Sequence, residues 1–172
     1  MFALSAFVFC LNLEAQAQKR KPVRKRATTT AKTAAATAAA NAAEVRSSAE
    51  KVSVQIKNVT KFVYLLGGIA KNIEDIDRDA KARKLSQTAL NLNDTNKKAV
   101  LQSLRNLTAG LAALETEFRA KPALRNYNFP IQGISDMSLQ AESLASDGQF
   151  TESGKMLLSI VEKLSDTLVG LP

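Results

Sequence analysis

The sequence contains no histidine and no tryptophan, and its only cysteine is Cys10. Without histidine the chain has no Ser-His-Asp triad and none of the Glu-x-x-His ligands that hold di-iron centres in helical bundles. A single cysteine forms neither an intrachain disulfide nor a Cys/His zinc site. These absences exclude most routes to catalysis and to transition-metal binding, so we expect a non-enzymatic protein without a cofactor.

An acidic run from Asp75 to Asp79 is the nearest approach to a metal motif. An EF-hand loop that began at Asp75 would need glycine at its sixth position and glutamate at its twelfth, where this chain has Ala80 and Ser86. We therefore expect no calcium site. Instead, the acids are predicted to pair with bases one helical turn later: Glu74 with Arg78, Asp77 with Lys81 and Asp79 with Arg83.

An apolar run from Phe2 to Leu13 opens the sequence and is followed by Ala15-Gln16-Ala17. This order resembles a secretory signal peptide, and the run is too short to span a hydrocarbon core of about 30 Å as a helix. We expect residues 1–17 to be a signal peptide, removed before Gln18, and the mature protein to be periplasmic or secreted without a transmembrane span. Against export, no Lys or Arg precedes the run and strongly basic residues follow it. An uncleaved cytoplasmic N-terminus is the alternative.

Positive charge is concentrated in the next segment. The formal net charge is +8, and residues 18–43 hold seven of the 24 basic residues and no acidic one. Residues 44–172 hold 17 basic and 15 acidic residues and are close to neutral. Residues 18–40 are rich in Ala and Thr and have little apolar side-chain surface to bury, so we expect a disordered basic linker whose Ala-rich end extends the following helix. The composition resembles that of linker-histone-like tails.

Three roles are open for such a linker: a solvated spacer, an adhesive for anionic lipid or cell-wall polymers, and an arm that neutralises nucleic-acid phosphates. An exported protein meets little nucleic acid, and the linker has no aromatic residue to stack on bases. We therefore expect an anionic envelope surface to be bound by six residues, called the basic arm below: Lys19, Arg20, Lys21, Arg24, Lys25 and Arg26. The alternative is a cytoplasmic nucleoid-type protein that binds DNA or RNA through the same arm.

A long first helix is predicted from Asn41 to about residue 83, because apolar residues recur there at spacings of three and four. Asn41 and Glu44 form a pair of the capping-box type at its start. Residues 62–66 are apolar on every side and directly precede Gly67-Gly68. We expect this stretch to be enclosed at the centre of a bundle. The alternative is a kink at the glycines that forms a binding groove.

Three further helices are predicted from the same periodicity. The second follows an N-cap at Asp94 and ends at Pro122. The third opens at Pro130, because a missing N–H is harmless in the first turn of a helix, and ends at Asp147-Gly148. The fourth begins near Phe150.

Short connections between consecutive helices favour antiparallel neighbours. Residues 41–172 are therefore expected to form an all-α, antiparallel up-down four-helix bundle with a long first helix, preceded by the disordered basic tail. The junction from Ala141 to Ser153 resembles that of a tetratricopeptide repeat, but no period of about 34 residues appears elsewhere in the chain. An ordinary helical hairpin is the simpler interpretation, and the bundle is expected to have a binding or structural role toward an unidentified partner.

Overall fold

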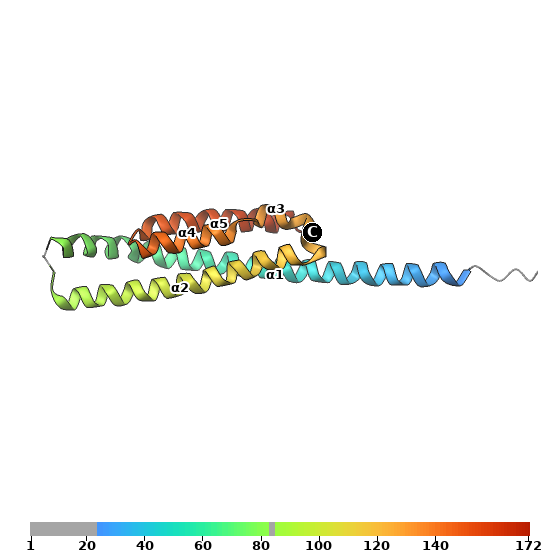
Figure 1. The fold of residues 1–172 in the computed structure, drawn as a ribbon, viewed down its shortest axis with the longest axis horizontal. Helices are drawn as coiled ribbons and strands as arrows, with labels where there is room; N and C mark the ends of the chain where they lie inside the picture. Colours follow the sequence, from blue (N-terminus) through green and yellow to red (C-terminus); the bar gives the residue numbers. More distant parts are fainter. Residues whose placement is uncertain (1–23, 83–84) are drawn as a thin grey trace, which may run out of the picture. The chain divides into compact units, whose positions relative to one another are not determined.

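The computed structural model describes the backbone of residues 24–82 and 85–172, and the side chains from Thr33 onward within these ranges. The chain divides into two compact units, Met1–Ala36 and Thr37–Pro172, of which the second contains the bundle (Figure 1). The predicted signal peptide and the first part of the predicted linker lie outside the described residues.

All regular structure in the described ranges is helical. The elements, in chain order, are α1 (Arg24–Lys81), α2 (Gln87–Ala120), the 3-10 helix η1 (Pro122–Tyr127), α3 (Asn128–Ile131), α4 (Ile134–Ser146) and α5 (Phe150–Gly170). α1, α2, α4 and α5 are the long helices, whereas η1 and the four-residue α3 connect α2 to α4. The predicted all-α bundle with a long first helix is confirmed.

α1 and α2 run antiparallel to one another. Lys51, in the first half of the bundle part of α1, contacts Glu117 near the end of α2 at 2.7 Å. Asp77, near the end of α1, accepts a hydrogen bond of 2.8 Å from Asn93 near the start of α2. This crossed order of contacts is that of a helical hairpin.

The later helices continue the up-down order. Arg105 in the middle of α2 contacts Glu142 in the last part of α4 at 2.9 Å, whereas Glu115 near the end of α2 accepts a hydrogen bond of 2.9 Å from the backbone N–H of Ser135 at the start of α4. α4 and α5 pack against one another on either side of the turn at Gly148. Each long helix therefore packs against its neighbour in the chain.

The core consists of the inner apolar stripe of each long helix. Spacings of three and four place these side chains on one helical face, where the bundle removes them from water. Buried apolar residues of the core include Val52, Val59, Leu66 and Ile73 of α1, Leu104, Leu111, Leu114 and Phe118 of α2, Ile134 and Ala141 of α4, and Phe150, Leu157, Ile160 and Leu164 of α5. The predicted apolar faces are therefore confirmed.

Two predicted N-caps are wrong. α1 begins at Arg24, so Asn41 lies inside the helix, because the alanines before it have the highest intrinsic helix propensity and continue the helix. α1 thus takes in residues 24–40 as well, and its side chains from 33 to 43 are exposed. α2 begins at Gln87 rather than after Asp94, because the hydroxyl of Ser86 accepts a hydrogen bond of 3.3 Å from the backbone N–H of Ala89.

The third long helix also begins later than predicted. Pro130 lies in α3, and α4 starts at Ile134 after Gly133. Gly133 has a φ of 87°, in the left-handed region that favours glycine, so the chain turns there before a new helix begins. The predicted turn between α4 and α5 is confirmed, with Gly148 at a φ of 80°.

Candidate functional site

The basic arm is divided by the limits of the described residues. Lys19, Arg20 and Lys21 lie outside them, so their placement stays a prediction. Arg24, Lys25 and Arg26 belong to the first turn of α1, which contains no acidic residue. Three of the six residues of the basic arm therefore lie together in one helical turn.

Residues 62–66 are not enclosed, contrary to the prediction. Tyr64 is 80% exposed and Leu65 is 56% exposed, whereas Leu66 is buried. The prediction fails because α1 contacts α2 on one side and α5 on the other, and its outer face meets solvent. α1 continues through Gly67-Gly68, and a Cβ atom added to either glycine would meet no other atom within 4 Å.

A groove of about 560 Å³ lies between α1 and α5 beside these glycines. Its floor includes Leu66 and Ala70 of α1 and Phe150 of α5, all of which are buried. Gly67 and Gly154 line it from the two helices and contribute no side chain to fill it. A groove thus lies beside the glycine pair, but without the kink that the alternative interpretation expected, and its binding role stays a prediction.

Charged residues line the mouth of this groove, and most are engaged. Oε1 of Glu74 accepts a hydrogen bond of 2.8 Å from the backbone N–H of Thr151, and Oε2 accepts one of 3.0 Å from the Thr151 hydroxyl. Arg78 pairs with Asp75, and Lys155 pairs with Glu152. Lys71 is exposed and, within the described ranges, has neither an ion pair nor a hydrogen bond from its side chain.

The predicted pairing of acids with bases one turn later is wrong for two of its three pairs. Glu74 binds Thr151 and not Arg78, and Asp77 contacts Nζ of Lys97 on α2 at 2.6 Å and not Lys81. The two acids bind neighbouring helices instead, and Arg78 pairs with Asp75 on α1. The third predicted pair involves Arg83, which lies outside the described residues.

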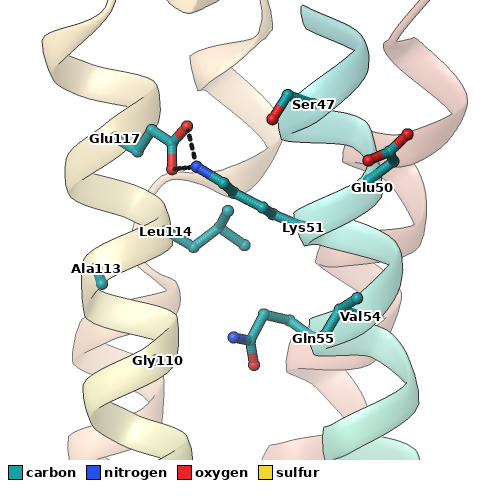
Figure 2. A pocket seen from close by; sticks show the side chains of 9 residues that line it. All are labelled: Ser47, Glu50, Lys51, Val54, Gln55, Gly110, Ala113, Leu114 and Glu117. Carbon is teal, nitrogen blue, oxygen red and sulfur yellow. Dashed lines mark hydrogen bonds and ion pairs between the residues drawn. The ribbon is translucent and has the colours of Figure 1, made fainter. Parts of the chain in front are cut away.

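A second groove, of about 530 Å³, lies between α1 and α2 (Figure 2). Lys51 reaches across it from α1, and its Nζ lies 2.8 and 2.7 Å from the two carboxylate oxygens of Glu117 on α2 (Figure 2). Leu114 lies below this ion pair on the α2 side (Figure 2). A salt bridge thus closes one part of the groove.

Glu117 is the centre of a wider charge network. Its Oε1 also accepts hydrogen bonds of 3.2 Å from Ser48 and 2.8 Å from Lys121, and Lys121 reaches Glu44 at 3.1 Å. Burial raises the pKa of Glu117, but hydrogen bonds and charges from Lys121 and Lys51 outweigh burial and lower this pKa overall. Hydrogen bonds to Glu117 and Glu44 raise the pKa of Lys121. The network holds α1 to α2 and presents paired charges instead of a free acid or base.

Glu115 is a buried carboxylate that joins α2 to α4. It is 3% exposed, and its oxygens accept hydrogen bonds of 3.0 Å from the N–H of Gly133 and 2.9 Å from the N–H of Ser135. Burial raises its pKa, but hydrogen bonds from Ser135 and Gly133 and the charge of Arg119 outweigh burial, so its pKa is lowered. The carboxylate caps the N-terminus of α4. This role was not predicted, because the capped N–H groups lie outside α2, at the start of α4.

Two further features would bear on function: groups of metal-binding side chains and helices able to span a membrane. The described residues contain no cluster of three or more Asp or Glu side chains arranged to hold a metal ion. None of the helices in the described ranges combines the length and the apolar character needed to cross a bilayer. Comparison with protein-family models, with curated proteins and with solved structures finds no match to this chain.

Proposed function

We propose that this protein is a non-enzymatic binding or structural protein of the cell envelope, exported to the periplasm or secreted, whose basic arm holds a helical bundle at an anionic surface. One observation carries the proposal: residues 18–43 contain seven bases and no acid, whereas residues 44–172 are close to neutral. Attraction to polyanions is therefore concentrated at one end of the chain. The grooves of the bundle are left to bind a partner.

The start of α1 supports this role for the arm. Arg24, Lys25 and Arg26 lie in the first helical turn, where the helix macrodipole is positive and adds to their attraction for anions. A basic residue close to an anionic lipid surface contributes roughly 1 kcal/mol to binding. The contribution falls with salt, because exposed charges are screened over about 10 Å at 0.1 M ionic strength.

The tethering function is tested by replacing all six residues of the basic arm with Gln. The mature chain is sedimented with vesicles rich in phosphatidylglycerol over a series of salt concentrations. We expect the unchanged protein to bind and to dissociate as salt rises, and the Gln variant to stay in solution.

A matched control removes the same number of charges from exposed positions of the bundle. Its substitutions to Gln are at Arg46, Lys57, Lys61, Lys81, Lys98 and Arg125. We expect this variant to keep most of its vesicle binding. Equal losses in the two variants would show that overall charge, and not the arm, determines binding.

Export is tested separately by expression in a bacterium with the native N-terminus. The intact mass and the cell fraction of the product are measured. A periplasmic species that begins at Gln18 supports the proposal, whereas a full-length cytoplasmic species contradicts it.

A second candidate function is binding of DNA or RNA in the cytoplasm through the same six bases. A full-length cytoplasmic product in the export experiment would favour this function. Binding to duplex DNA would then weaken with salt, with a slope of roughly −5 in log K against log salt if all six bases contact phosphates. The six-residue Gln variant would lose this binding.

A further inference from the structure

We propose that the groove between α1 and α5 is a binding site for a single-chain amphipathic anion such as a fatty acid. The acyl chain lies along the apolar floor beside Gly67 and Gly154, and the acid group lies beside Lys71. This site is separate from the basic arm, and the inference does not depend on the function proposed for the arm.

The space for a ligand comes from the two glycines. The groove volume of about 560 Å³ falls within the range of small-molecule sites. A Cβ atom added to Gly67 would meet no atom within 4 Å, and one added to Gly154 would lie 3.6 Å from Cδ2 of Leu66. A large side chain at Gly67 would therefore extend into the groove without a clash at its root.

The lining of the groove suits a hydrocarbon chain. Leu66, Ala70 and Phe150 form a buried floor, Val63 is partly buried, and Leu158 at one edge is 48% exposed. An acyl chain on this floor would be removed from water together with the exposed part of Leu158, and this burial favours binding.

The groove is longer on α1 than on α5. Its lining residues extend from Val63 to Arg78 on α1, about 22 Å, and from Phe150 to Leu158 on α5, about 12 Å, at the rise of an α-helix. A single extended hydrocarbon chain fits within this length.

Charge selects an anion. Among the lining residues, Arg78 pairs with Asp75, Lys155 pairs with Glu152, and the Glu74 carboxylate is held by Thr151. Lys71 is left as the lining charge without a partner in the described ranges. A carboxylate would supply the missing partner, whereas a cationic head group would be repelled.

The first experiment measures binding of dodecanoate to the full mature chain by isothermal titration calorimetry, below the concentration at which dodecanoate forms micelles. Dodecyltrimethylammonium, which has the same chain length and the opposite charge, is titrated in parallel. We expect saturable binding of one dodecanoate and at least about tenfold weaker binding of the cation. Absence of saturable dodecanoate binding, or equal binding of both, would overturn the proposal.

The position of the site is tested with Gly67→Leu, and Gly68→Leu is the matched control. Both variants replace an exposed glycine within α1 by a better helix former, so both are expected to fold, which thermal unfolding verifies. Of these two positions, residue 67 lines the groove and residue 68 does not. We expect Gly67→Leu to weaken dodecanoate binding about tenfold or more and Gly68→Leu to leave it unchanged. Unchanged binding in Gly67→Leu would place the ligand elsewhere and overturn the proposal.

The partner of the acid group is tested with Lys71→Gln. Lys57→Gln, a change at another exposed lysine of α1 that does not line this groove, is the control. We expect about fivefold weaker dodecanoate binding in Lys71→Gln alone, because one exposed ion pair is lost. The Gln variant of the basic arm should bind dodecanoate as tightly as the unchanged protein, and loss of binding there would assign the ligand to the arm and overturn the inference.

Discussion

At the scale of single residues, Glu115 connects helices that are separated by η1 and α3. Its two oxygens bind the backbone N–H groups of Gly133 and Ser135, which the start of α4 leaves without partners inside the helix. Arg119 lies 2.9 Å away and compensates the charge. A buried carboxylate is therefore tolerated in the interior because its hydrogen-bond donors and Arg119 favour its ionised form and outweigh the cost of burial.

This geometry predicts a dependence of stability on pH. The pKa of Glu115 is lower in the folded protein than in the unfolded chain, where it is about 4.3. The stabilisation is complete above the unfolded pKa and is lost as pH falls through the folded pKa. Glu115→Gln should lower the free energy of unfolding by about 1 to 3 kcal/mol at pH 7. In urea titrations, the difference between the two proteins should shrink as pH is lowered from 7 to 3.

Glu117→Gln is the control for this prediction. Glu117 is bound by lysines, and Lys51 is half exposed, so its ion pairs are weakened by solvent and by salt. We expect a loss of less than about 1 kcal/mol that disappears at high salt. A larger loss at Glu117 than at Glu115 would contradict the role assigned to burial.

Burial of single residues was predicted where the periodicity was regular and missed where it was not. The regular periodicity of α2 predicted an apolar face, because spacing alone determines which side of a helix faces a core, and Leu104, Leu111 and Phe118 are buried on it. Exposure of Tyr64 was missed, because it depends on how many helices surround α1, which the sequence of α1 does not contain. The role of Glu115 was missed because the N–H groups that it binds belong to residues at the start of α4.

At the scale of elements, glycines have opposite roles inside a helix and between helices. Gly68 lies within α1 and is exposed, whereas Gly148 lies between α4 and α5 with a φ of 80°. We expect Gly68→Ala to raise the free energy of unfolding by about 0.5 to 1 kcal/mol, because alanine is the better helix former.

Gly148→Ala should have the opposite effect and lower the free energy of unfolding by about 1 to 2 kcal/mol. The cost is conformational, since a Cβ atom at this position would meet Oδ2 of Asp77 at 3.8 Å, an ordinary contact. Thermal unfolding of both variants, followed by circular dichroism, shows whether each substitution raises or lowers the free energy of unfolding. Shifts of the same sign would contradict the assignment of Gly148 to the left-handed region.

The ends of the helices were less predictable than their faces. Asp94 and Ser86 are both good N-cap residues. The hydrogen bond from the backbone N–H of Ala89 to the hydroxyl of Ser86 identifies Ser86 as the N-cap of α2. Pro130 is compatible with a first helical turn, but the left-handed conformation of Gly133 moved the start of α4 to Ile134. A helix end thus depends on single local contacts that several residue types satisfy equally well.

At the scale of the whole molecule, the core and the basic arm occupy different parts of the chain. Val45 is the first residue of the buried core, and side chains from 33 to 43 are exposed. We expect deletion of residues 1–36 to change the free energy of unfolding by less than about 0.5 kcal/mol, because the described side chains that it removes, those of residues 33–36, are exposed. The same deletion should abolish vesicle binding.

Urea titration and vesicle sedimentation of the truncated chain provide both readouts. A marked loss of stability would show that the N-terminal unit packs on the bundle. Retained, salt-sensitive vesicle binding would move the tether from the basic arm to residues 37–172.

The candidate sites were predictable to different degrees. Segregation of charge is a property of the sequence, so the basic arm could be identified from the sequence. Its function stays a prediction. Gly67 drew attention because a glycine pair is unusual inside an apolar helix, whereas Gly154 gave no such signal. The groove exists because the bundle brings these two glycines to the same place, and this depends on the packing of α5 against α1.

The hydrogen bonds from Thr151 to Glu74 have a consequence for the order of folding. Asp77 and Asn93 join α1 to α2 across 16 residues, whereas Glu74 and Thr151 are 77 residues apart. Contacts between distant residues carry the larger loop-closure cost and tend to form late. We expect the α1–α5 contact to close last and to open first, so the stabilisation from a ligand bound across it would appear mainly as slower unfolding and hardly as faster folding.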